Sequence, residues 1–282
     1  MANGVDLVPS NKNGCLWKIS HNFDGRDYVV GDVHGHLGQL KIQLENLNFD
    51  PSVDRLFFLG DIVDRGPDSL AMIDLIDHST YISVLGNHEA MLIAGFEDST
   101  CVQMHCSNGG DWFYKLPTSE QQVIVDKVRS WPWAIEIDVG DARVGLVHAD
   151  VPDGNWDTVK TFLSQIDKAW SDGASLTEPN LEVAARSLLW RRSLASRLYL
   201  EVLGLGTKKR TLSEYKRDFL NRIDCLENVD SSLVDTFNIS GIDSVYMGHT
   251  YVPIPTAIGD CYFLDSYRGE ASEELGIRCI NP

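Results

Sequence analysis

The stretch Tyr28-Val29-Val30-Gly31-Asp32-Val33-His34-Gly35 decides the fold of this 282-residue chain. A short run of aromatic and β-branched residues leads into a glycine turn that carries an aspartate and a histidine. Apolar residues then follow at helical spacing, namely Leu37, Leu40, Leu44 and Leu47. The segment therefore predicts a buried strand, a polar turn and an amphipathic helix.

The same order of strand, polar turn and helix occurs twice more. Residues 56–59 run into Gly60-Asp61, and Pro67 opens a helical stretch whose buried face is expected to hold Leu70, Ile73 and Ile76. Residues 81–85 run into Gly86-Asn87-His88-Glu89, and a helix is expected to end at Gly95. Strands that alternate with helices predict an α/β fold built from βαβ units with parallel strands.

Two later segments repeat the strand and the turn. Residues 144–147 precede His148, and residues 244–247 precede Gly248-His249. Residues 181–237, between these segments, have helix-forming composition and no strand signal, so we expect a helical cap or insertion there. Open α/β sheets bind ligands at the carboxyl ends of their strands, and all five polar turns are expected at such ends.

Composition argues against several classes of function. The chain has 24 Lys and Arg against 41 Asp and Glu, a net charge of −17, which disfavours nucleic acid and anionic membranes as partners. No apolar run approaches the roughly 20 residues that span a bilayer. The six cysteines form no CxxC pair, so we expect neither a structural zinc site nor a dense disulfide framework, and we expect a cytoplasmic location.

The polar turns present a set of candidate metal ligands. Their side chains combine two carboxylates, three imidazoles and one amide: Asp32, Asp61, His34, His148, His249 and Asn87. A mixed oxygen and nitrogen set suits Mn, Fe or Zn better than calcium, which prefers oxygen ligands. A single Gly-Asp after a strand is ordinarily only a turn, but convergence from five strand ends predicts a dinuclear site in which one carboxylate bridges two metals.

The three turns near the amino terminus resemble the signature of the phosphoprotein phosphatase (PPP) family of metallophosphoesterases. Other segments are similar to its bacteriophage lambda and bacterial branch of serine/threonine protein phosphatases, namely residues 108–113, 148–150, 190–192 and 248–250. The resemblance implies a calcineurin-like β-sandwich flanked by helices. It also implies one metallophosphoesterase domain over residues 1–282, with the helical insertion at about 181–237.

The resemblance assigns a role to each candidate residue. It implies that Asp32 and His34 bind the first metal, that Asp61 bridges, and that Asn87, His148 and His249 complete the second site. It implies that Arg65 and Arg192 grip phosphate, although the adjacent Arg191 remains an alternative to Arg192. His88, paired with Asp64, matches the general acid. Glu89 and Asp150 adjoin ligands and are expected to hydrogen-bond around them, whereas His105 lies off every strand end and is expected at the surface or in the core.

The resemblance implies a hydrolase of phosphate monoesters that uses two divalent metal ions. Mn²⁺ is favoured, with Fe or Zn as alternatives, and the expected substrates are phosphoserine and phosphothreonine proteins. A symmetrical dinucleoside polyphosphate (Ap4A) hydrolase, a neighbouring branch, is the alternative. Asp64-Arg65 and His88-Glu89 favour the protein phosphatase. Residues 264–269 depart from the family's Asp-Thr-Gly-Ala pattern and place an additional cation, Arg268, near the expected site.

Overall fold

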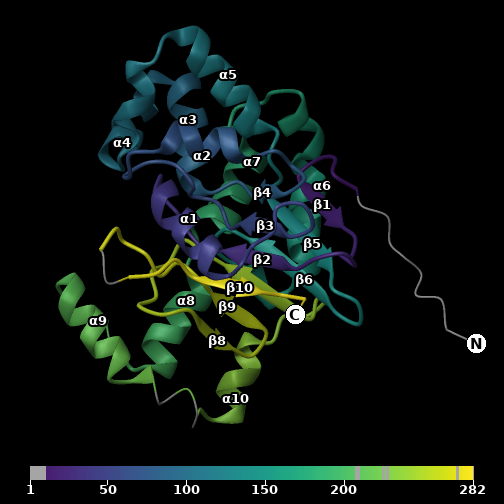
Figure 1. Cartoon of the computed structure of the whole chain (residues 1–282), viewed down its shortest axis with the longest axis vertical. Helices are drawn as coiled ribbons and strands as arrows, with labels where there is room; N and C mark the ends of the chain where they lie inside the picture. Colours follow the sequence, from purple (N-terminus) through teal and green to yellow (C-terminus); the bar gives the residue numbers. More distant parts are fainter. Residues whose placement is uncertain (1–10, 207–209, 224–225, 227–228, 271–272, 282) are drawn as a thin grey trace, which may run out of the picture.

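Two β-sheets lie face to face at the centre of the molecule (Figure 1). The computed structural model describes residues 11–206, 210–223, 226, 229–270 and 273–281. One sheet has the strand order β10 (Ile277–Cys279), β2 (Asp27–Val30), β3 (Arg55–Phe58) and β4 (Tyr81–Ser83). Strands β2, β3 and β4 are parallel, as the three repeated segments predict, and β10 pairs antiparallel with β2 at the edge.

The second sheet collects strands from both halves of the chain. Its order is β1 (Leu16–Ile19), β5 (Ala134–Asp138), β6 (Arg143–Val147), β7 (Ser244–Met247), β9 (Cys261–Phe263) and β8 (Thr256–Ile258). Strands β6 and β7, which the sequence predicts ahead of His148 and His249, are parallel neighbours. Their carboxyl ends therefore meet at one edge, as the strand ends of the first sheet do.

The interface between the sheets is a dry apolar layer. Val29, Phe57 and Ile82 project from the first sheet into a buried cluster with residues of β1, β5, β6 and β7. The strand residues on either side of them, such as Val30 and Phe58, pack instead in the cluster beneath the helices. This alternation follows from the two-residue period of a strand. It confirms the expected β-sandwich flanked by helices.

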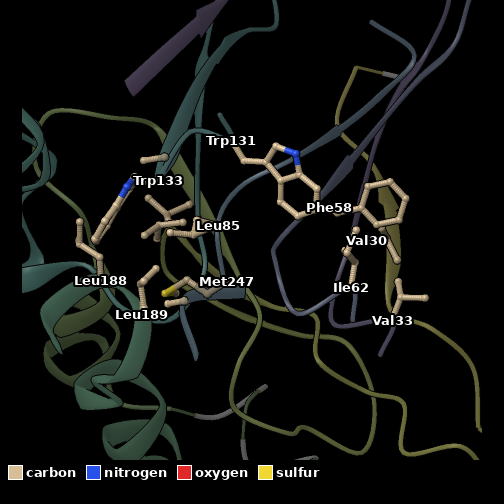
Figure 2. Packing of buried hydrophobic residues seen from close by; sticks show 14 of the residues in the cluster. Val30, Val33, Phe58, Ile62, Leu85, Trp131, Trp133, Leu188, Leu189 and Met247 are labelled. Carbon is tan, nitrogen blue, oxygen red and sulfur yellow. The ribbon is translucent and has the colours of Figure 1, made fainter. Parts of the chain in front are cut away.

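Helices cover the outer faces of both sheets. The first sheet is covered by α1 (Leu37–Asn46), α2 (Ser69–Leu75), α3 (Asn87–Glu97) and α5 (Thr118–Arg129), with the short α4 (Val102–Ser107) beside α3. The second sheet is covered by α6 (Trp156–Ser171) and α7 (Pro179–Ala185). In Figure 2, Leu188 and Leu189 reach from the segment after α7 toward Met247 of β7 and Trp133.

Two details of the helix predictions are wrong. Leu70, expected on the buried face of α2, is 43% exposed, whereas Met72 and Ile73 are buried; the helix begins at Ser69 rather than at Pro67. Gly95 does not end α3, which continues to Glu97. A Cβ atom at Gly95 would lie 1.9 Å from the hydroxyl oxygen of Tyr114, so this glycine makes room for a neighbouring side chain.

The described part of residues 181–237 contains helices and turns and no strand. After α7 come π-helical turns at Arg186–Trp190 (η4) and Leu198–Val202 (η5), and then α8 (Ser193–Arg197), α9 (Leu212–Leu220), α10 (Ser231–Val234) and a 3₁₀ turn at Asp235–Phe237 (η7). Further 3₁₀ turns lie at Ser99–Cys101 (η1), Gly110–Lys115 (η2) and Pro152–Gly154 (η3). The helices within the described ranges include none long and apolar enough to cross a bilayer.

Five cysteines are described and each carries a free thiol, while Cys225 lies outside the described residues.

Candidate metal centre and active site

The polar turns of both sheets meet at one edge of the sandwich. Asp32, Asp61 and Asn87 follow β2, β3 and β4, and the two remaining turns follow β6 and β7 of the other sheet. All six predicted ligands are buried, with exposed fractions of 0–7%. The structure thus brings together side chains that are up to 217 residues apart in the chain.

Backbone strain is concentrated at this edge. Outside glycine, positive φ angles occur at eight described residues, and five of these belong to the candidate site: His34, Asp61, Asp64, Arg65 and His249. Residues with side chains occupy this left-handed region at a cost of about 1–3 kcal/mol each. Hydrogen bonds from the amides of His34 and Gly35 to the carbonyls of Asp61 and Ile62 hold two of these turns together.

His34 and two carboxylates form the first group of candidate ligands. The Nε2 atom of His34 lies 3.8 Å from Asp32 Oδ2 and 3.9 Å from Asp61 Oδ2. The opposite ring nitrogen, Nδ1, lies 3.0 Å from the carbonyl oxygen of Val63 and donates to it. Because the single ring proton of a neutral imidazole is used there, the lone pair of Nε2 faces the carboxylates.

His148, His249 and Asn87 form the second group beside Asp61. His148 Nε2 lies 3.4 Å from Asp61 Oδ1 and 2.9 Å from Asn87 Oδ1, and His249 Nδ1 lies 2.8 Å from the same amide oxygen. Each imidazole uses its other nitrogen to donate to a backbone carbonyl, that of Leu59 or that of Trp190. Three groups with lone pairs therefore face one another, an arrangement that a cation would stabilise.

The protonation of these side chains suits metal binding. Burial lowers the pKa of His34 and of His148, and it lowers the pKa of His249 to about 3, so all three imidazoles are neutral near pH 7. Burial alone would raise the pKa of Asp61, but His148, His88 and His34 outweigh it and lower that pKa. Neutral imidazoles around an ionised carboxylate are the protonation states that divalent transition metals require.

Two clusters of these residues have the spacing to hold a metal ion. One contains His34, Asp61 and His88, and the other contains Asp61, His148 and His249, so the Asp61 carboxylate is common to both. The donor atoms fit the mixed oxygen and nitrogen ligation of Mn, Fe or Zn. The Arg65 guanidinium now occupies part of this space, with Nη1 2.5 Å from His34 Nε2. The lone pair of that nitrogen cannot serve Arg65 and a metal at once.

His88 and Asp64 form a buried pair beside Asp61. His88 Nδ1 lies 2.7 Å from Asp64 Oδ2, and its Nε2 atom faces the site 3.8 Å from Asp61 Oδ2. Burial alone would lower the pKa of His88, but the adjacent carboxylates of Asp61 and Asp64 outweigh it and raise the pKa. Arg65 Nη2 approaches the same Nε2 atom at 3.1 Å. A proton carried by His88 would therefore face the cleft.

The structure separates the two adjacent arginines. Partial burial lowers the pKa of Arg192. The carboxylates of Asp265, Asp32 and Asp61 act in the opposite direction and favour its charged form. Arg191 donates to Ser193 Oγ at 2.7 Å and lines a different cavity of about 410 Å³ with Arg197. Asp150 fixes this turn, since its carboxylate accepts the amide N–H of Ser193 at 2.7 Å.

Glu89 supports the turn that carries Asp61. Its carboxylate is fully buried and accepts amide N–H groups from Gly86, Asp61 and Ile62 at 2.8–2.9 Å. Burial and the charge of Asp61 raise the pKa of Glu89 to about 8. The expected hydrogen bonding around the ligands is therefore present, and it runs from one strand end to the next.

Arg268 belongs to residues 264–269, which depart from the expected Asp-Thr-Gly-Ala pattern, and its charge acts on the candidate ligand Asp32. Its Nη1 and Nη2 atoms bind both oxygens of the fully buried Asp265 at 2.5 and 2.6 Å, and its guanidinium lies 4.5 Å from the ring centroid of Tyr251. Burial and the negative charge of Asp265 raise the pKa of Asp32. The positive charge of Arg268 acts in the opposite direction. The additional cation is thus largely neutralised by its own ion pair.

His105 is a buried residue, as one of the two expectations had it, and it also contacts the candidate site. Its side chain is fully buried, and its Nε2 atom lies 3.0 Å from Asp64 Oδ2. The indole Nε1 of Trp112 donates to the other oxygen, Asp64 Oδ1, at 2.7 Å. Both residues belong to the segment around Asn108-Gly109-Gly110, so their proximity to that motif was the available signal; no strand end marks them.

Comparison with known proteins agrees with this geometry. A family model described as calcineurin-like phosphoesterase matches residues 28–253. Serine/threonine-protein phosphatase 2 of Escherichia coli strain K12 is 40% identical over 138 residues, which cover 48% of this chain and 63% of that protein. The chain therefore spans about three fifths of the length of the curated relatives it matches.

Two further similarities concern a shorter segment and the fold. The symmetrical bis(5'-nucleosyl)-tetraphosphatase of Pseudomonas putida strain W619 is 47% identical over 74 residues, which cover 25% of each protein. A solved structure of a cold-active protein tyrosine phosphatase mutant aligns over 92% of this chain and 78% of that one, with 15% identity and a TM-score of 0.53. At that identity the similarity concerns the fold alone.

Proposed function

Because this chain belongs to the calcineurin-like phosphoesterase family, we propose that it is a metal-dependent phosphomonoester hydrolase, a protein serine/threonine phosphatase. One observation carries this proposal. The Asp61 carboxylate lies between His34 on one side and His148 on the other, and the His88–Asp64 pair stands beside it. Two metal positions that share one carboxylate, with a proton donor at their edge, suit phosphate ester hydrolysis.

The proposed metal ligands follow the two groups of side chains. Asp32, His34 and Asp61 would hold one cation, and Asp61 with Asn87, His148 and His249 would hold the other. We favour Mn²⁺ because the set mixes carboxylate, amide and imidazole donors, with Fe or Zn as alternatives. Divalent cations bound there supply an activated water near neutral pH and neutralise phosphate charge.

His88 is the proposed general acid. An alkoxide from serine or threonine is a poor leaving group, so a positioned proton donor contributes about 10²–10⁴-fold to the rate. Asp64 accepts a hydrogen bond from the Nδ1–H group of His88, and this bond directs Nε2 toward the cleft. The Nε2 proton would pass to the ester oxygen as the P–O bond breaks.

Arg65 and Arg192 are the proposed phosphate-binding residues. The Arg65 fork already spans the site-facing nitrogens of His34 and His88. Arg192 is favoured over Arg191 because the carboxylates of the site act on it, whereas Arg191 lines another cavity. Guanidinium forks bind phosphate oxygens in pairs and offset the charge that develops in the transition state.

The names of the relatives bear on the substrate. Three curated relatives, at 35–40% identity, are named serine/threonine-protein phosphatase 1 or 2, which favours phosphoserine and phosphothreonine in proteins. The similarity to a symmetrical tetraphosphatase keeps Ap4A hydrolysis as the second candidate. We further propose that the family domain with its insertion at 181–237 forms a single domain over residues 1–282, and that the protein is cytoplasmic.

A substrate panel tests this proposal. Metal-depleted protein reloaded with Mn²⁺ would be assayed for turnover of phosphoserine, phosphothreonine and phosphotyrosine peptides and of Ap4A, with metal content measured on the same sample. We expect the phosphoserine and phosphothreonine peptides to be turned over fastest. The His88→Asn variant is expected to lose about 10²–10⁴-fold on these peptides, while His78→Asn, at a half-buried position outside the candidate site, serves as the matched control.

Faster cleavage of Ap4A than of any phosphopeptide would replace the first candidate with the second. Clean, metal-loaded protein that hydrolyses no compound of the panel would refute both.

A further inference from the structure

The Asp64 carboxylate receives more hydrogen bonds than the pair with His88 requires. His88 Nδ1 and His105 Nε2 lie 2.7 and 3.0 Å from its Oδ2 atom, and Trp112 Nε1 lies 2.7 Å from its Oδ1 atom. Asp64 is fully buried. Nothing in the chemistry proposed so far uses the two additional donors, which come from α4 and from the 3₁₀ turn η2 that follows it.

The hydrogen-bonding pattern fixes which atom donates. A carboxylate only accepts, so His105 Nε2 carries a proton and donates it in this hydrogen bond, while the Tyr114 hydroxyl lies 3.0 Å from Nδ1 on the other side of the ring. Tyr114 and His105 therefore form a chain of donors that ends on Asp64 Oδ2, and Trp112 donates separately to Asp64 Oδ1. Hydrogen bonds to an ionised group are about twice as strong as neutral ones, so each contributes to the orientation of the carboxylate.

The backbone around this chain of donors leaves no spare room. A Cβ atom at Gly110 would lie 2.0 Å from His105 Nε2, and one at Gly95 would lie 1.9 Å from the Tyr114 hydroxyl oxygen. The donors are thus packed in place by α3, α4 and η2, which contact one another; α3 and α4 lie side by side in the upper part of Figure 1. Asp64 itself has a φ of 69°, a conformation that needs support from its surroundings.

We propose that His105 and Trp112 are positioning residues, with Tyr114 behind them, that hold the Asp64 carboxylate so that it aims His88 Nε2 at the leaving oxygen. This inference rests on the proposed function, since it assigns His88 a proton to deliver. Asp64 without the two donors could turn about its side-chain bonds, and the His88 ring would then lose its fixed direction. The loss should concern proton delivery and leave metal and phosphate binding in place.

A comparison of leaving groups separates this role from a merely structural one. A nitrophenolate departs without a proton, whereas a serine alkoxide needs one, so loss of orientation at His88 should slow only the second reaction. The variant Trp112→Phe removes the indole N–H and keeps an aromatic ring. Trp131→Phe is the matched control, because the buried indole N–H of Trp131 has no hydrogen-bond partner among the described residues.

We expect Trp112→Phe to lower kcat on a phosphoserine peptide by about tenfold or more, a fraction of the full general-acid contribution. Its kcat on p-nitrophenyl phosphate should change by less than about threefold. Trp131→Phe should leave kcat on both substrates unchanged. His105→Gln, which keeps an N–H that can reach Asp64, should retain more peptide activity than His105→Ala. Equal losses on both substrates, or no loss on either, would overturn the inference.

A second readout does not depend on turnover. The proton between His88 Nδ1 and Asp64 should give a downfield ¹H NMR signal in the wild-type protein and in Trp131→Phe. It should shift or broaden in Trp112→Phe, or in Tyr114→Phe if the first variant does not fold. An unchanged signal in a folded variant would refute the positioning role even if peptide turnover fell. Wild-type protein that shows this signal but hydrolyses no phosphate ester would instead refute the proposed function.

Discussion

Single residues of the site combine strain with dense hydrogen bonding. Asp61 is held at a φ of 50° while its own amide and that of Ile62 donate to the buried Glu89. The convergence of the candidate ligands was predictable from Gly-Asp and Gly-Asn-His-Glu turns at strand ends. The left-handed backbone was not, because no residue type at these positions requires it; contacts between the turns impose it.

Glu89 offers a test at this scale. Its two oxygens accept three amide N–H groups, and the amide nitrogen of a glutamine would face one or two of those donors instead. We expect Glu89→Gln to lower the free energy of unfolding by about 1–3 kcal/mol and to weaken metal binding by about 10- to 100-fold. Chemical denaturation and metal titration would measure both. The exposed Glu45→Gln should change neither, and a Glu89→Gln variant with normal metal affinity would contradict the supporting role.

Secondary structure elements were predicted where periodicity was strong. Leu40 and Leu44 are buried in α1, as their spacing indicates. The predictions were wrong or incomplete where tertiary packing decided the outcome: Gly95 lies inside α3 because Tyr114 needs the space, and His105 turns toward Asp64 from a helix that follows no strand. The edge strand β10 was also missed, since its pairing with β2 joins residues about 250 apart in the chain.

The start of β2 carries a pH-dependent contribution to stability. Asp54 is buried, and its carboxylate accepts the backbone amide and the guanidinium of Arg26 at 2.7 Å. Burial would raise the pKa of Asp54, but the hydrogen bonds from Arg26 and from the Asp50 amide lower it below its ordinary value of 3.8. The stabilisation is therefore complete above that value and is lost as the pH falls through the lower pKa of the folded protein.

We accordingly expect Asp54→Asn to cost about 2 kcal/mol of unfolding free energy at neutral pH. The difference from wild type should shrink as the pH falls below the ordinary value of 3.8 and through the lower pKa of the folded protein. Urea denaturation of both proteins across this range would measure it. The exposed Asp141→Asn should match wild type at every pH, and a difference for Asp54→Asn that grew in acid would refute the assignment.

The net charge of −17 belongs to the whole molecule and says little about the site. The candidate ligands and their neighbours concentrate acceptor groups, such as Asn87 Oδ1 between His148 and His249, where a cation is needed. A phosphate dianion would be repelled by the carboxylates of an empty site. We therefore expect bound metal to be needed both for the stability of the candidate site and for substrate binding.

Metal removal should destabilise the whole domain. A ligand present at 100 times its Kd stabilises the folded state by about 2.7 kcal/mol, which for a chain of this size corresponds to roughly 5–10 °C in Tm. We expect chelation to lower the Tm by that amount and Mn²⁺ to restore it. The shift should be much smaller in Asp61→Asn. A Tm that is the same with and without metal would count against the proposed centre.

The rate of phosphate release from a phosphoserine peptide, measured on metal-depleted and Mn²⁺-reloaded protein, tests the proposed metal centre directly. We expect negligible release without metal and recovery on reloading for the wild type and for the control Asp141→Asn. Reloaded Asp61→Asn should stay below about one hundredth of the wild-type rate, because the shared carboxylate of the two metal positions is altered. Release by the metal-depleted protein at the reloaded rate, or undiminished release by Asp61→Asn, would contradict the proposed metal centre.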